Sequence, residues 1–157
     1  MKLLVLGSDF GTYDLVNEAH KSGDYVVVAD YYEQTYTKQI ADESINISTL
    51  DIDAITDYCK LNYIEAIVYG ANDVNIAAGR KIAKRLNLPY YCENDFAYEL
   101  SCNKRMFKEL CKKIGAPIAT DYIISPTPSD EEIEKIIYPV VVKAVDLAAN
   151  VGFSYCN

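Results

Sequence analysis

Short apolar runs alternate with amphipathic segments through the first ninety residues. Four runs predict buried strands, because each is short, rich in aliphatic or aromatic residues and bounded by turn residues. They are "KLLVLG" (residues 2–7), "YVVVAD" (25–30), "EAIVYG" (65–70) and "LPYYC" (88–92). Between them, residues 12–23, 50–62 and 73–87 show helical spacing, with Thr12, Asp51 and Asp73 as expected N-caps. Residues 1–93 therefore predict a Rossmann-like, doubly wound α/β unit: a parallel sheet covered by helices on both faces.

The pattern changes near Asn94. A basic amphipathic helix is expected over residues 103–115, a strand over 116–125, and a helix over 129–137 that opens with a capping box, Ser129 facing Glu132. A buried strand follows over residues 140–145. This order predicts an α+β arrangement, so residues 94–157 are expected to begin a second domain rather than complete one.

Composition narrows the function classes. The 157-residue chain has a net charge of −8 and a sequence pI near 4.6, which disfavours nucleic acid and anionic membranes as partners. The apolar start is too short for a signal peptide or a membrane span, so we expect a cytoplasmic protein. Five scattered cysteines and one histidine show no zinc-ligand spacing; we expect buried thiols and no metal site.

Two candidate sites follow strands of the first unit. The turn "GSDFGTYD" joins a strand to a helix, where free N–H groups could bind an anion, and Asp30 stands where dinucleotide folds place a ribose-binding acid. The G-x-G-x-x-G spacing is absent, however, and Asp9 would repel a pyrophosphate, which favours a structural turn. The second candidate runs from Gly70 to Asp73, although Asp73 is equally suited to capping a helix.

Two lysines are candidates for phosphate binding in the second part. Lys104 begins the basic helix, where a positive charge opposes the helix dipole. Lys143 lies within the run "YPVVVKA" and shares a strand face with Val141 and Val145. An ammonium group on a buried strand requires an anion nearby or a route to solvent, and the residues alone leave both open.

Together these segments resemble the ATP-grasp superfamily, in particular the branch with biotin carboxylase, the large subunit of carbamoyl-phosphate synthase and D-alanine–D-alanine ligase. The resemblance rests on an α/β unit followed by a helix that opens with a lysine and ends in "IGAPIA", then by "YPVVVKA" and a loop of small residues. It implies that Lys104 and Lys143 contact ATP phosphates and that the loop 146–152, with Asn150 and Gly152, covers them. Asn103 stands where the family usually has aspartate, and the loop has one glycine rather than several.

The resemblance implies that the whole protein uses ATP and Mg²⁺ to activate a carboxylate as an acyl phosphate, which an amine then attacks. The family's adenine contacts and Mg²⁺ ligands would lie beyond Asn157, so we expect residues 1–157 to be an inactive N-terminal fragment of a ligase. The resemblance leaves room for a homodimer. Two alternatives remain at this point: an enzyme of nucleotide sugars or dinucleotides, and a non-catalytic Rossmann-like nucleotide-binding or regulatory module.

Overall fold

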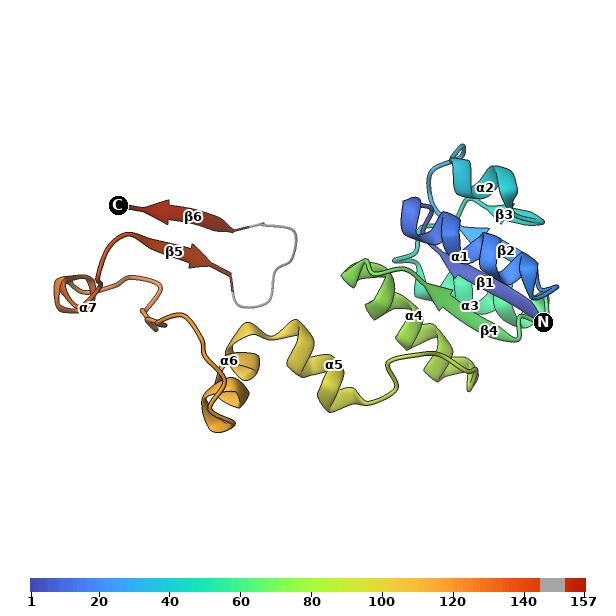
Figure 1. Cartoon of the computed structure of the whole chain (residues 1–157). Helices are drawn as coiled ribbons and strands as arrows, with labels where there is room; N and C mark the ends of the chain where they lie inside the picture. The colour runs from blue at the N-terminus through green and yellow to red at the C-terminus, as the bar shows by residue number, and fades with distance from the viewer. Residues whose placement is uncertain (145–151) are drawn as a thin grey trace. The chain divides into compact units, whose positions relative to one another are not determined.

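The computed structural model describes residues 1–144 and 152–157. These residues divide into two compact units, Met1–Glu93 and Asn94–Asn157 (Figure 1).

The first unit is built on a four-stranded parallel sheet. Its strand order is β3-β2-β1-β4, which is the order of the first four strands of a doubly wound sheet. The strands are β1 (Lys2–Leu6), β2 (Tyr25–Ala29), β3 (Glu43–Ile45) and β4 (Ala66–Tyr69). The α/β class predicted from the alternating pattern is confirmed.

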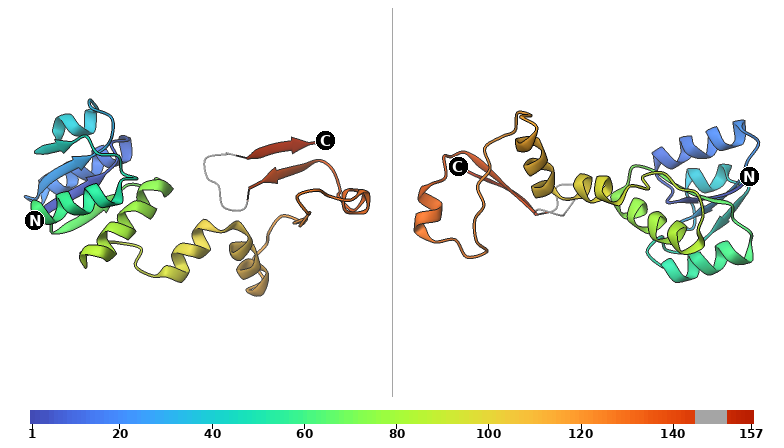
Figure 2. Two further views of the ribbon diagram at one scale, coloured as in Figure 1. Left: turned by 180° about the vertical axis from the view of Figure 1, so that it is seen from behind. Right: turned by 90° about the horizontal axis from the view of Figure 1, so that it is seen from below.

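Helices cover both faces of this sheet (Figure 2). They are α1 (Phe10–Lys21), α2 (Tyr36–Ile40), α3 (Ile52–Leu61) and α4 (Asp73–Leu86). Alternate residues of a strand face opposite sides, so Leu4 and Leu6 join the core beneath α3 and α4, whereas Val5 packs with Val16 of α1. Burying each of these side chains contributes roughly 1.5–3 kcal/mol, which makes the two-sided sheet the main source of stability.

The strand predicted over residues 88–92 is absent. After α4 the chain turns at Asn87, whose φ is 53°, and the Leu88 N–H closes the helix end on the Ala83 carbonyl at 3.0 Å. Pro89 has no N–H to give to a ladder, and Cys92 also has a positive φ, of 65°. The fourth strand of the sheet is instead Glu43–Ile45, a short edge strand that the apolar pattern does not reveal.

Two helix starts also differ from expectation. Asp9, rather than Thr12, caps α1, and Asn72, rather than Asp73, caps α4. In each case the capping side chain accepts a hydrogen bond from a backbone N–H of the first turn: that of Thr12 for Asp9 and that of Val74 for Asn72, both at 2.9 Å. The cap predicted at Asp51 is confirmed.

The second unit contains three helices and a hairpin among its described residues. They are α5 (Asp95–Cys102), α6 (Lys104–Lys113), α7 (Asp130–Glu134) and the antiparallel pair β5 (Val140–Lys143) and β6 (Phe153–Cys156). The capping box of Ser129 and Glu132 is confirmed. The segment expected as a strand over residues 116–125 is irregular, because no described strand pairs with it.

The expectation that the strand at residues 140–145 is buried is wrong for the described part of this chain. Val141 and Val142 are each 43% exposed, and Lys143 is exposed. The strand pairs only with β6 in a two-stranded ribbon, so its faces are not covered by a second layer. Val145 lies outside the described residues.

Only some of the cysteine side chains are buried. Cys59, on α3, is 2% exposed, and burial raises the pKa of its thiol to about 12. Cys111 is also buried, whereas Cys92 and Cys102 are exposed, which corrects the expectation of buried thiols throughout. Within the described ranges, no helix has both the length and the apolar character needed to cross a bilayer.

Candidate functional site

The carboxyl ends of β1, β2 and β4 meet at one edge of the first unit's sheet. Open α/β sheets bind their ligands at this edge. Gly7 follows β1 with a φ of +86°, and a Cβ added there would lie 2.2 Å from Nδ2 of the buried Asn75. The backbone conformation therefore favours glycine at position 7, and any side chain there would also have to displace the Asn75 amide.

The N-terminus of α1 is occupied by a side chain of the protein itself. Asp9 Oδ1 accepts a hydrogen bond from the Thr12 N–H at 2.9 Å, and the Thr12 hydroxyl donates to the Asp9 carbonyl at 2.8 Å. The carboxylate satisfies a backbone donor that could otherwise bind a phosphate, and its charge complements the helix dipole. The turn is therefore closed to a pyrophosphate, as its sequence predicts.

Asp30 is also engaged within the chain. It is 8% exposed, and its carboxylate accepts hydrogen bonds from the Ser8 hydroxyl at 2.8 Å and from the Tyr32 N–H at 3.0 Å. These bonds hold the turns after β1 and β2 together. A carboxylate committed in this way is poorly placed to bind a ribose, so the geometry disfavours the dinucleotide alternative.

Lys38 lies next to this acid and was not found by sequence reasoning. It is 7% exposed, and its ammonium group donates to the carbonyls of Asp30 and Tyr32, at 2.9 and 2.5 Å, and to Asn46 Oδ1 at 2.6 Å. Burial lowers the pKa of this amine, and the nearby Asp30 charge partly opposes that effect. A lysine in a polar segment gives no sequence signal that it is buried.

An open groove of about 480 Å³ lies beside these turns. We call it the edge groove; it is lined by residues 8–10 and 34–37 together with Tyr13 and Gln39. All of these residues belong to the first unit, at the start of α1 and around α2.

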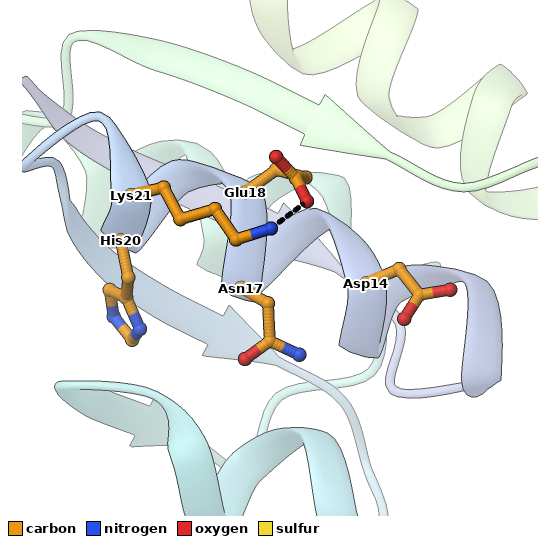
Figure 3. A pocket seen from close by; sticks show the side chains of 5 residues that line it. All are labelled: Asp14, Asn17, Glu18, His20 and Lys21. Atoms are coloured by element: carbon orange, nitrogen blue, oxygen red, sulfur yellow. Dashed lines mark hydrogen bonds and ion pairs between the residues drawn. The ribbon is translucent and has the colours of Figure 1, made fainter.

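A second depression, of about 750 Å³, lies along α1 (Figure 3). Its lining residues all come from that helix: Asp14, Asn17, Glu18, His20 and Lys21. The ion pair between Lys21 and Glu18, at 2.6 Å, joins two largely exposed side chains and is a surface contact of little energetic weight.

In the second unit, Lys104 is the first residue of α6 and is exposed. Asn103 caps the helix, accepting hydrogen bonds from the N–H groups of Arg105 and Met106 at 3.0 and 3.1 Å. The helix cap expected at this position is therefore present, because asparagine caps a helix as well as aspartate does.

Lys143 and Gly152 lie at the same end of the hairpin. Lys143 is opposite Phe153 across the two strands, with its Nζ 5.6 Å from the centre of the phenylalanine ring. The Ala144 N–H donates to the Gly152 carbonyl at 3.2 Å, and Gly152 has a φ of +69°. Asn150, the other predicted loop residue, lies outside the described residues. The part of the chain that the structure describes contains no group of three or more potential metal ligands.

No known protein-family profile matches the chain. A phosphoribosylamine–glycine ligase of Leptospira interrogans is 28% identical over 108 residues, which is 68% of this chain but 25% of that protein. Among solved structures, the biotin carboxylase domain dimer of the Hydrogenobacter thermophilus 2-oxoglutarate carboxylase, determined with MgADP, ADP and bicarbonate, matches over 99% of this chain and 37% of its own. Its TM-score is 0.76 at 23% identity. The N5-carboxyaminoimidazole ribonucleotide synthetase of Thermotoga maritima gives a TM-score of 0.71 at 23% identity, over 98% of this chain and 40% of its own.

The chain has the fold of the N-terminal portion of ATP-grasp enzymes. This confirms the resemblance drawn from the sequence. The chain spans about a quarter of the length of the ligase relative and about two fifths of the ATP-grasp structures. Both units take part in the likeness, because the structural matches extend over nearly the whole chain.

Proposed function

We propose that the chain is the N-terminal part of an ATP-grasp ligase that joins a carboxylate to an amine. The observation that carries this proposal is the structural match, which extends through the α/β unit into the segment with Lys104 and Lys143. In this proposal, residues 1–93 are the domain that precedes the ATP-grasp domain. Residues 94–157 then provide the linking helix and the first part of the ATP-grasp domain.

Lys143 is the residue best suited to contact nucleotide phosphates. Lys143 is exposed and lies on a strand, and its Nζ is 5.6 Å from the centre of the Phe153 ring. A strand fixes the position of the charge before the ligand arrives, which is the condition for efficient electrostatic stabilisation. Lys104, Asn150 and Gly152 complete the proposed phosphate-binding set.

The proposed reaction has two steps. A substrate carboxylate attacks the γ-phosphorus of ATP, forming an acyl phosphate and releasing ADP. An amine then attacks the acyl carbon, forming an amide and releasing inorganic phosphate. The Lys143 ammonium group would stabilise the negative charge on the phosphate oxygens during the first step. In this proposal the ligands for Mg²⁺ come from parts of the protein outside residues 1–157.

The test is to replace Lys143 by alanine in the natural protein that carries this chain and to measure ATP-dependent phosphate release with a panel of carboxylates and amines. We expect kcat/KM to fall about 100-fold, the usual effect of losing one preorganised contact to a developing charge. Lys135→Ala is the matched control, since Lys135 is also exposed and lies shortly before the same strand. Equal activity of the Lys143 variant and the wild type would rule out the phosphate role, and absence of phosphate release with every pair would contradict the ligase proposal.

A further inference from the structure

Among the described residues, none that lines the edge groove has a cationic side chain. Asp9 is the only formally charged residue of this lining. Lys38 belongs to the same short helix as three lining residues, but its ammonium group is buried and gives its three hydrogen bonds to oxygens of the chain. An ammonium has three N–H donors, so none remains for a ligand. A phosphate in this groove would therefore meet a carboxylate without a compensating cation.

The anion-binding position of the fold is also filled. In doubly wound proteins a ligand phosphate binds at the N-terminus of the helix that follows the first strand. Here Asp9 caps that terminus and bonds the Thr12 N–H. A side-chain carboxyl group of the protein thus occupies the place where a ligand anion would bind.

The remaining walls suit a positively charged organic ligand. Phe10 is 85% exposed and Tyr36 72% exposed, and both line the groove together with the partly buried Tyr13. Aromatic faces attract cations through their quadrupole and also contact apolar groups. A carboxylate beside exposed aromatic rings therefore favours an ammonium group attached to an apolar or aromatic body.

We propose that the edge groove binds an organic amine in its ammonium form rather than a phosphorylated ligand. We further propose that this amine is the one that attacks the acyl phosphate. That second step rests on the proposed ligase function, whereas binding of the amine in the groove does not. A ligand without phosphate would distinguish this chain from the similar proteins whose names specify phosphoribosyl or ribonucleotide compounds.

Binding can be tested with the 157-residue chain and without ATP. The ¹⁵N-labelled chain is titrated with tyramine, with 4-ethylphenol, which lacks the ammonium group, and with ribose 5-phosphate. We expect tyramine to give saturable shifts of the amides of residues 8–13 and 34–39. The affinity for 4-ethylphenol should be about fivefold lower, the size of one cation–π and ion-pair contribution at an exposed site, and ribose 5-phosphate should not bind.

Asp9→Asn is the informative variant, because asparagine caps a helix as well as aspartate but carries no charge. It should weaken tyramine binding about fivefold. Asp51→Asn is the matched control: Asp51 caps α3 in the same way, outside the groove, and its variant should bind like the wild type. Phe10→Ala provides a second variant that does not depend on the cap, and it should also weaken binding.

Saturable binding of ribose 5-phosphate in the groove, or equal affinities of the wild type and Asp9→Asn for tyramine, would overturn the inference. Neither result depends on catalysis. If tyramine binds as expected while the natural protein releases no phosphate from ATP, the ligase proposal fails and the groove assignment stands.

Discussion

Position 79 of α4 admits only glycine without rearrangement, because the neighbouring Tyr69 ring leaves no space for a methyl group. A Cβ added there would lie 2.2 Å from Cδ1 of Tyr69 and 3.2 Å from Cδ1 of Leu6. The Tyr69 ring cannot easily move, because it is 1% exposed and its hydroxyl donates to the Tyr91 carbonyl at 2.7 Å. A glycine inside a helix normally costs about 1 kcal/mol relative to alanine, so here close packing outweighs helix propensity.

We therefore expect Gly79→Ala to destabilise the chain by about 1–3 kcal/mol, the usual range for an overpacked core, although propensity alone predicts the opposite sign. Urea denaturation followed by circular dichroism measures this change. Lys81→Ala, at an exposed position of the same helix, should stay within about 0.5 kcal/mol of the wild type. A Gly79→Ala variant as stable as the wild type would show that the Tyr69 ring relaxes at no cost.

At the same scale, the sequence predicted some residues whose role is local, although the caps expected at Thr12 and Asp73 are Asp9 and Asn72, and it missed Lys38, whose role depends on distant contacts. The cap at Asp51 and the capping box of Ser129 could be predicted because each involves neighbours three residues apart. The burial of Lys38 depends on Tyr32 and Asn46, which approach it only in the folded protein. The predicted phosphate contacts of Lys104, Lys143, Asn150 and Gly152 remain predictions.

At the level of elements, the buried parallel strands were the most predictable, because strands covered on both faces are apolar throughout. Strand β3 was missed: its Glu43-Ser44-Ile45 sequence is short, lies at the sheet edge and has an exposed middle residue. The segments 88–92 and 116–125 are apolar enough for strands, but each contains a proline and neither pairs with a described strand. Whether a segment forms a strand depends on a neighbouring strand in the folded protein, and the apolar pattern of the sequence does not show which segments have one.

Helix α6 gives the prediction at this scale. Asn103→Ala removes the acceptor for the N–H groups of Arg105 and Met106 and should cost about 1 kcal/mol of local helix stability. Hydrogen exchange should therefore become roughly fivefold faster for the amides of the first turns of α6. Asn103→Asp, which keeps an acceptor, is the control, and unchanged exchange in Asn103→Ala would show that the cap is not important.

At the level of the whole molecule, burial is concentrated in the first unit. Both core clusters lie within residues 1–93. Among the described residues of Asn94–Asn157, Cys111 alone is buried, whereas Phe107, Ile114 and Ile137 are more than half exposed. Stability therefore comes mainly from the two-sided sheet. The apolar side of α6 is covered only in part: Cys111 is buried and Met106 and Leu110 are partly buried, whereas Phe107 is exposed.

This distribution determines the response to alkaline pH. Burial raises the pKa of the Cys59 thiol to about 12 and also raises the pKa values of the Tyr58 and Tyr69 hydroxyls, all in the first unit. These groups ionise more readily in the unfolded chain, which therefore binds fewer protons than the folded protein above pH 9. Stability should fall as the pH rises from about 9 to 12. Lys38 acts in the opposite direction, since its lowered pKa favours folding as the pH rises, but it is a single group.

The measurement is the urea midpoint at pH 8, 10 and 11, which should decrease along this series. Cys59→Ala should be less stable at pH 8, because it leaves a small cavity, but its midpoint should decline less steeply above pH 9. A midpoint that stays constant from pH 8 to 11 would contradict the assignment of these groups as preferentially neutral in the folded protein.

Because Cys59 is buried, the rate at which its thiol is alkylated reports how often the native protein unfolds locally. Alkylating reagents attack the thiolate, and this thiol is both shielded from solvent and held in its protonated form. Cys92 and Cys102 are exposed and should be modified rapidly, whereas Cys59 can be modified only when local unfolding opens the packing between α3 and the sheet. The slow phase of iodoacetamide labelling, followed by mass spectrometry, would therefore give the rate of this local opening in the protein without any substitution.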